Sequence, residues 1–514
     1  MNPLHQRRSG ILLHPTSLPG PHGHGDLGQE AHEFLRFLAR GGQSLWQMLP
    51  VVPTGGGDSP YDSPSAFAGS PELVNLRYLV EDGLLDASDL FAPTRLRDAL
   101  RARYGASRAF RGRRLRKAFQ RFRVGVARHG LEELRERERF WLQDFALFAA
   151  LKVQRHGEPW FSWPMDLRRR EPAALNAARA ALGDEIAFHE FVQLLFDRQW
   201  QRLRGHARHL GVLLLGDTPM FVAHDGADVW QHQGLFQLDA SGQRRCVAGV
   251  PPDYFSAEGQ RWGNPLYDWR RLQSTGYAWW IERLRASLRR FDALRLDHFI
   301  GFHRYWEIPA HSSSAREGRF VEVPGQDFFE KAQSELAYLP FIAEDLGIVT
   351  PEVERLRDAF GLPGMRVLGF AFADGAQAYL PHRFHRRCVV YTGTHDNDTL
   401  LGFLDAASRT QDPQQREQLQ KERDRALSYV GSDGREPHWD LIRSALASVA
   451  DTAIFPIQDV LGQGTEARMN VPGTPNGNWG YRVKAELLSS SVAAKLTRLT
   501  ETYERVPSSL RRDP

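Results

Sequence analysis

The sequence predicts an α/β protein built on a (β/α)8 TIM barrel, and two patterns support that prediction. Eight short apolar runs, each bounded by Gly, Pro or polar residues, have the length of buried strands. Stretches with helical spacing of apolar residues lie between them, as in Phe191 to Gly211, where a glycine follows the last turn. Strands that alternate with helices along one chain are typical of parallel barrels.

The eight predicted strands are spread unevenly along the chain. They begin, in order, at Gly10, Ser44, Gly211, Phe291, Pro340, Gly364, Cys388 and Thr452. About 160 residues separate the second strand from the third, about 75 the third from the fourth, and about 55 the seventh from the eighth, which is far more than ordinary connections need. We therefore expect one barrel domain over 1–514 with three insertions: a largely helical one at 54–205, a loop-rich one at 218–290 and a helical one at 400–450.

Composition excludes several classes of protein. No apolar run approaches the ~18 residues of a membrane helix, so no membrane partner is expected. Only Cys246 and Cys388 are present, which gives no disulfide framework and fits a reducing, cytoplasmic location.

A net charge of +4 and a pI near 9.0 raise the alternative of nucleic-acid binding. The chain has 60 Arg and only 6 Lys, a skew that indicates codon composition more than a phosphate-binding surface. In the densest basic run, Arg111 to Gly130, the residues Leu115, Phe119, Phe122 and Val126 share one side of a helix. We interpret this run as a solvated helix face and expect no nucleic-acid partner.

Polar residues follow the apolar runs at the ends where barrel enzymes have their active sites. These residues are Asp217, Arg295, Asp297, Glu344, Asp345, His395 and Asp396. A single carboxylate such as Asp345 or Asp398 is as easily a helix cap or a loop salt bridge. That alternative does not explain Asp297, Glu344 and Asp396 together, because the ends of three separate strands would place all three in one concave mouth.

Paired carboxylates in a pocket suit glycosyl transfer. One attacks the anomeric carbon and a protonated one supplies a proton to the leaving oxygen; a separation of about 5–5.5 Å gives retention through a covalent intermediate. Other chemistries have weaker signals, because Thr394 to Asp398 lacks any HxxxH or CxxC partner motif and Gly23 to Gly28 lacks the ending of a phosphate loop. We expect no metal and no cofactor.

Long motifs then identify a family resemblance. They include GILLHPTSLPGP, GDSPYDSPSAFAGSPELVNL, GDTPMFVAHDGADVW, RLDHFIGF, AEDLG, YTGTHDND and RMNVPGTPNGNW. Nearly end to end, the chain resembles the 4-α-glucanotransferases of glycoside hydrolase family 77, also called amylomaltases, in the α-amylase clan. The resemblance implies an enzyme that transfers segments of α-1,4-glucans, such as maltodextrins, to the 4-hydroxyl of another glucan or of glucose. We also expect a monomer.

The resemblance also implies residue roles. Asp297 matches the nucleophile, Glu344 the general acid/base, and Asp396 a third carboxylate that holds sugar hydroxyls. Arg295 precedes Asp297 by two residues on one strand, so both side chains point into the mouth and the cation keeps the nucleophile ionised. Glu344 must instead stay protonated. The residues expected to bind substrate are Tyr61, Asp217, Trp262, Arg295, His298, His395 and Asn478.

Some of these assignments have alternatives. His298 could be a packed histidine, and Tyr61 or Trp262 could be core aromatics. Trp262 lies in AEGQRWGNP, which predicts a loop able to close over the site. The chain could also be an α-amylase-like hydrolase with weak transfer, or a catalytically silent glucan-binding protein.

Three positions depart from the family pattern. Gly56 replaces an aromatic residue, which puts a secondary glucan-stacking contact in doubt; Ser70 replaces Asn and Ile300 replaces Arg.

Overall fold

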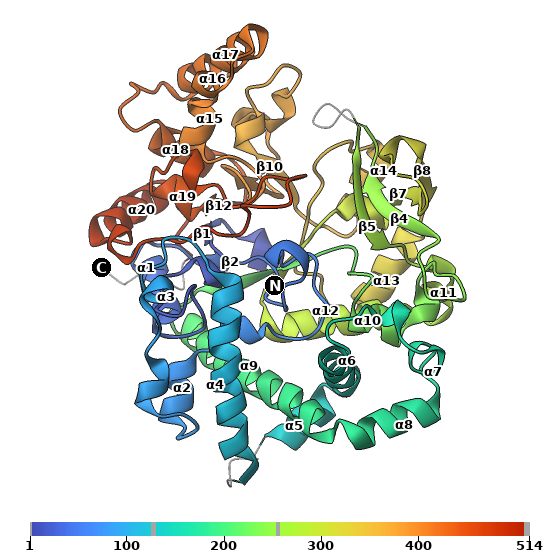
Figure 1. Ribbon diagram of the computed structural model, residues 1–514. Coiled ribbons are helices and arrows are strands. Elements are labelled where there is room, and N and C mark those ends of the chain that lie inside the picture. Colours follow the sequence, from blue (N-terminus) through green and yellow to red (C-terminus); the bar gives the residue numbers. More distant parts are fainter. Residues whose placement is uncertain (1–2, 125–129, 253–257, 508–514) are drawn as a thin grey trace.

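The computed structural model describes residues 3–124, 130–252 and 258–507, and its centre is a closed barrel of eight parallel strands (Figure 1). The strands are β1 (Arg8–Leu12), β2 (Leu45–Gln47), β3 (Leu213–Thr218), β6 (Ala293–Leu296), β9 (Phe341–Ala343), β10 (Gly364–Val367), β11 (Cys388–Tyr391) and β12 (Thr452–Pro456), neighbours in that order, with β12 closing on β1. The predicted (β/α)8 barrel is confirmed, because each apolar run supplies one strand.

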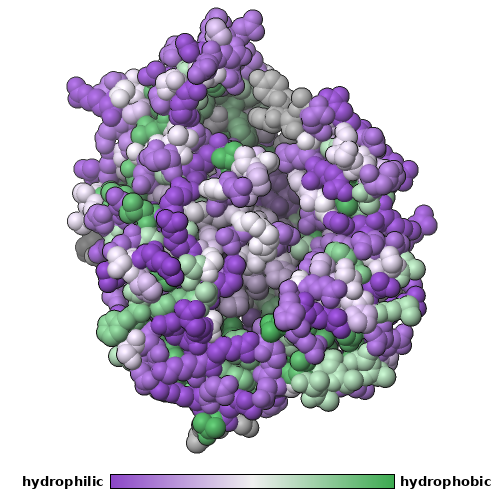
Figure 2. All heavy atoms as spheres, viewed as in Figure 1, coloured by the Kyte–Doolittle hydropathy of each residue, from purple (hydrophilic) through white to green (hydrophobic). Residues whose placement is uncertain are grey.

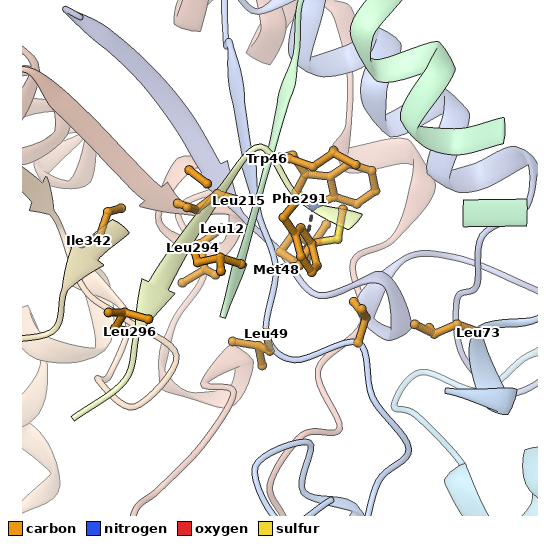
Figure 3. Packing of buried hydrophobic residues seen from close by; sticks show 14 of the residues in the cluster. Leu12, Trp46, Met48, Leu49, Leu73, Leu215, Phe291, Leu294, Leu296 and Ile342 are labelled. Atoms are coloured by element: carbon orange, nitrogen blue, oxygen red, sulfur yellow. Dashed lines mark hydrogen bonds between the residues drawn. The ribbon is translucent and has the colours of Figure 1, made fainter. Parts of the chain in front are cut away.

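The strands form because they are buried on both faces, as continuous runs of apolar residues in parallel sheets are. Figure 3 shows part of the resulting core, where Leu12, Leu215 and Leu294 gather from three barrel strands. Helices that pack on the strands include α1 (Gln29–Arg40), α9 (Gly183–His209), α12 (Ala278–Arg290) and α18 (Pro437–Ala447). This packing fixes the barrel, so that the residues at the strand ends are held by a rigid frame.

The connection from β2 to β3 is helical. It contains α2 (Leu76–Glu81), α3 (Thr94–Arg97), α4 (Tyr104–Val124), α5 (Leu131–Arg137), α6 (Leu142–Gln154), α7 (Met165–Arg168) and α8 (Pro172–Ala181) before α9. The helix predicted from Phe191 begins eight residues earlier, at Gly183, where Asp184 and Glu185 in the first turn favour helix initiation.

The Arg-rich run lies in α4. Leu115, Phe119 and Phe122 are buried as predicted, whereas Val126 lies outside the described residues. On the other side of the helix, Lys117 and Arg121 form ion pairs with Asp86. The positive charges of these two side chains are therefore paired with a carboxylate of the chain itself.

A second sheet, which the sequence did not predict, lies beside the barrel mouth (Figure 1). Its antiparallel strands are β4 (Cys246–Val250), β5 (Gln260–Pro265), β7 (Arg304–Pro309) and β8 (Arg319–Glu322), in the spatial order β5-β4-β7-β8. The stretch expected to be loop-rich supplies β4 and β5, together with α10 (Ala227–Gln231) and α11 (Trp269–Ser274). The other two strands form a further insertion, between β6 and β9. These strands are four to six residues long and do not alternate regularly between apolar and polar residues, so the sequence pattern did not indicate them.

The remaining helices complete the barrel and its last insertion. They are α13 (Gly325–Leu336), α14 (Pro351–Ala359), α15 (Leu400–Leu404), α16 (Ala406–Arg409), α17 (Pro413–Val430), α19 (Ile457–Val460) and α20 (Ser490–Thr502). Within the described ranges, none of the helices has the length and apolar character needed to span a membrane.

Candidate functional site

The C-terminal ends of the barrel strands open into a cavity of about 850 Å³, visible as a hollow in the face shown in Figure 2. The antiparallel sheet forms one of its walls. Eight of the predicted site residues line it, namely Tyr61, Trp262, Arg295, Asp297, His298, Glu344, His395 and Asp396. The volume is at the upper end of the ~300–1,000 Å³ that ligand pockets span, so an extended substrate fits.

Asp297 is the carboxylate that follows β6, and a chain of charged contacts holds it. Its Oδ1 lies 2.8 Å from Nη2 of Arg295, and Nη1 of Arg295 lies 2.7 Å from Oδ2 of Asp217 on the neighbouring β3. Burial alone would lower the pKa of Arg295, but Asp217 and Asp297 outweigh it and hold that pKa above its ordinary value. Arg295 is therefore a permanent cation next to Asp297, as the spacing of the two residues predicted.

Asp217 does not face the cavity. Its side chain is fully buried beneath the mouth, where it accepts hydrogen bonds from Arg295 and, at 2.7 Å, from the hydroxyl of Tyr61. The geometry assigns it to positioning Arg295 and Tyr61, so the prediction that Asp217 itself binds substrate gains no support from its place.

Glu344 follows β9, and its surroundings favour the neutral carboxyl group, in contrast to those of Asp297. Burial raises the pKa of Glu344 to about 8; the negative charge of Asp297 adds to the increase, and Arg295 opposes it. The backbone N–H of His298 donates a hydrogen bond of 2.8 Å to Oε2. Glu344 is thus protonated at neutral pH, and because Oε2 accepts this bond, Oε1 is left to carry the proton.

His298 takes an unusual backbone conformation that makes this contact. Its φ of 52° lies in the left-handed region, which non-glycine residues rarely adopt. Burial lowers the pKa of His298 to about 4, so its imidazole is neutral. The main chain of His298 therefore holds the carboxyl group of Glu344, and its ring faces the cavity.

Trp262 is not on a loop, contrary to the sequence-based expectation. It belongs to β5, paired with β4 across a bulge. The indole meets the ring of His298 edge-on, with centroids 4.8 Å apart, and 39% of the residue is exposed. The glycines on either side, Gly259 and Gly263, have positive φ, and Gly263 lies within the bulge.

Asp396 lies beyond β11 and is held by residues that the sequence did not single out. Asn470 donates from Nδ2 to Oδ1 of Asp396 at 2.6 Å, and Arg468 donates to the backbone oxygen of Asp396 at 2.6 Å. Nε2 of His395 is 3.4 Å from Oδ2. Asn470 and Arg468 belong to the RMNVPGTPNGNW motif. A site residue was predicted from this motif, but it was Asn478 and not Asn470.

An aromatic stack forms the floor near Asp396. The ring of Tyr61 lies parallel to that of His395, with centroids 5.1 Å apart and an interplanar angle of 13°. The ring of Trp479 also packs on the ring of Tyr61, with centroids 5.7 Å apart. Trp479 was not predicted as a site residue, but it lines the cavity.

Asn478 is, with Asp217, one of the two predicted site residues that do not line the cavity. Its side chain accepts a hydrogen bond from the N–H of Val471 at 2.9 Å and donates one to the carbonyl of Thr474. These two bonds stabilise the loop to which Asn478 belongs. It lines a separate depression next to 94–106.

The two single carboxylates with alternative interpretations have structural partners. Asp345 is buried against Arg357 of α14 and accepts from the N–H of Met365 at 2.7 Å. Asp398 pairs with Arg409 at 2.8 Å. Neither lines the cavity.

The three departures from the family pattern lie in different surroundings. Gly56 is exposed, and its N–H donates to Asp62 at 3.0 Å. Ser70 is buried, with its N–H donating to Val51. Ile300 alone of the three lines the cavity. Among the described residues, no group of three or more His, Cys, Asp or Glu is placed to hold a metal ion.

The chain is similar to known proteins over almost its full length. A family model described as 4-alpha-glucanotransferase matches residues 13–488. The 4-alpha-glucanotransferase of Thermus thermophilus is 49% identical over 509 residues, covering 97% of this chain and 99% of that protein. That of Synechocystis sp. is 44% identical over 510 residues, covering 98% and 99%. The structure of an amylomaltase from Streptococcus agalactiae in complex with acarbose is 35% identical, with a TM-score of 0.93 over 97% of this chain and 100% of that one.

Proposed function

Because the chain belongs to the 4-alpha-glucanotransferase family and is an enzyme of that kind, we propose that it transfers α-1,4-glucan segments with retention, using Asp297 and Glu344. The observation that supports this assignment is the contrast between the two carboxyl groups. Asp297 lies against the cation Arg295, whereas Glu344 is buried and protonated. Environments that separate two carboxyl groups in this way assign one as nucleophile and the other as acid.

In the first step, a carboxylate oxygen of Asp297 attacks the anomeric carbon of the donor. The bond from that carbon to the glycosidic oxygen breaks, and Oε1 of Glu344 gives its proton to the leaving 4-oxygen. Asp396, held by Asn470, accepts hydrogen bonds from hydroxyls of the sugar whose ring becomes positively charged.

In the second step, Glu344 must act as a base, and the same contacts explain the change. Once Asp297 is esterified its negative charge is gone, so one of the causes that raise the pKa of Glu344 disappears while Arg295 remains. Glu344 then takes the proton of the acceptor 4-hydroxyl, whose oxygen attacks the anomeric carbon and releases Asp297.

Pure maltotriose tests the proposed function. Transfer between two maltotriose molecules gives glucose and longer oligomers, whereas hydrolysis gives glucose and maltose. We expect oligomers of four or more glucose units to form from the earliest times sampled. Maltose and glucose in equal amounts without longer products would make the chain an α-amylase-like hydrolase, and binding without any product would make it a silent glucan-binding protein.

Trp262 is placed to favour sugar over water as the acceptor. Its partly exposed indole lies against His298, adjacent to Asp297 in sequence, and can cover a glucose ring. We expect Trp262→Ala to reduce the ratio of transfer to hydrolysis roughly threefold to tenfold, since a stacking contact contributes on the order of 1 kcal/mol. The ratio is measured from total reducing ends and free glucose. If both rates fall together and the ratio is unchanged, Trp262 only supports the sheet.

A further inference from the structure

The antiparallel sheet carries a group of large side chains on the cavity wall that the proposed reaction does not use. They are Arg304 and Trp306 on β7 and Phe320 on β8, and all three line the same cavity as the carboxylates. Trp306 and Phe320 are direct cross-strand partners, with ring centroids 4.8 Å apart at an angle of 72°. The guanidinium carbon of Arg304 lies 4.1 Å from the centre of the Phe320 ring. We call these three residues the aromatic ledge.

The aromatic ledge is held rigidly. Nε1 of Trp306 donates a hydrogen bond of 2.8 Å to the carbonyl oxygen of Ala315. The indole also packs on a small cluster made of Val247, Ile308 and Ala315. A Cβ at Gly318 would lie only 2.2 Å from Nε1 of Trp306, so the chain crosses directly over the indole. A ring fixed in this way loses little entropy when a ligand stacks on it.

Core packing does not account for Phe320. It lies on β8, the edge strand of the sheet, and 42% of it is exposed in the cavity wall. Among the residues that the structure describes, none accepts a hydrogen bond from the Arg304 side chain, whose Nε is buried. The aromatic ledge therefore combines an exposed apolar ring with unused hydrogen-bond donors, which is the pairing that pyranose rings need on their C–H faces and hydroxyl edges.

Phe320 lies at the opposite edge of the antiparallel sheet from Trp262. Trp262, which contacts His298, is on β5. Phe320 is on β8, three strands away in the order β5-β4-β7-β8. At the usual spacing of strands this is about 14 Å. That separation exceeds the width of one glucose ring, so a sugar stacked on Phe320 is a different one from a sugar covered by Trp262.

We propose that Arg304, Trp306 and Phe320 bind a glucosyl unit of a long α-1,4-glucan away from the cleaved bond, and so make the enzyme favour longer chains. This inference rests on the proposed function. Arg304 donates to hydroxyl groups, Phe320 offers its exposed face to the ring, and Trp306 fixes Phe320 from the side.

The test is the dependence of kcat/KM on chain length. Phe320→Leu keeps an apolar side chain over the sheet but removes the aromatic face, and Phe320→Tyr restores the ring. We expect Phe320→Leu to lower the ratio of kcat/KM for maltoheptaose to that for maltotriose about threefold to tenfold. Phe320→Tyr should recover the wild-type ratio. Phe91→Leu is the matched control, because Phe91 is 78% exposed and does not line the cavity.

A second measurement separates binding from folding. The dissociation constant of maltoheptaose, measured by calorimetry in an Asp297→Asn background, should rise with Phe320→Leu by a similar factor while the melting temperature stays within about 3 °C. An unchanged length ratio and an unchanged dissociation constant would overturn the inference. Equal losses with both substrates would also overturn it, since they indicate a structural role. A wild-type protein that neither binds nor converts either oligosaccharide would instead refute the proposed function.

Discussion

Asp297→Asn is expected to abolish transfer, with kcat lower by roughly 10⁴-fold or more, as for the loss of other catalytic nucleophiles. The amide has nearly the same volume but cannot form the ester with the anomeric carbon. Initial rates on maltotriose provide the measurement.

The fold should survive this substitution. Arg295 keeps two hydrogen bonds to Asp217, so the guanidinium is not left without a partner. We expect a melting temperature within about 3 °C of the wild-type value. Asp82→Asn, at an exposed position outside the cavity, is the matched control and should keep full activity. Substantial activity in Asp297→Asn would place the nucleophile at another carboxylate.

Glu344→Gln is expected to lower kcat/KM on maltotriose by about 10²- to 10⁴-fold, because no proton reaches the leaving oxygen. A maltotriosyl fluoride donor needs little protonation, so its first step should be at least tenfold less impaired, seen as a burst of fluoride release. Glu354→Gln, on the exposed side of α14, controls for the change of charge. Equal impairment of both donors would show that Glu344 is not the acid.

The pH profile gives an independent measure of the same group. Glu344 has its pKa raised to about 8 by burial, and the first step needs its protonated form. For wild-type enzyme on maltotriose, kcat/KM should therefore fall as the pH rises through about 8 and be maintained below it. The fluoride donor should lack this decrease. A decrease of equal size with both donors would assign it to a group other than the acid.

Several features of this protein were decided by local sequence. Each barrel strand is an apolar run of three to six residues, and its length and flanking residues are visible without any partner. The carboxylates Asp297 and Glu344 come directly after such runs, and because parallel strands of a barrel all end at one mouth, their convergence followed from the order of residues alone. The pairing of Arg295 with Asp297 followed in the same way from a spacing of two along a strand.

Other features depended on contacts between distant segments. Glu344 and Asp345 are adjacent, yet one faces the cavity and the other pairs with Arg357, which only the packing of α14 determines. Asn470 reaches Asp396 across 74 residues of chain, while Asn478, eight residues further along, turns back on its own loop.

The antiparallel sheet is the largest element that only the tertiary structure decided. Its strands come from two insertions separated by β6, and the pairing of β4 with β7 joins Gly249 to Trp306, which no local pattern in the sequence specifies. The same holds for the protonation of Glu344, which arises from burial by surrounding segments and from a charge on the neighbouring strand. Strand formation depends on side chains a few residues apart, whereas burial and electrostatic coupling depend on distances in space, and these exist only once the chain has folded.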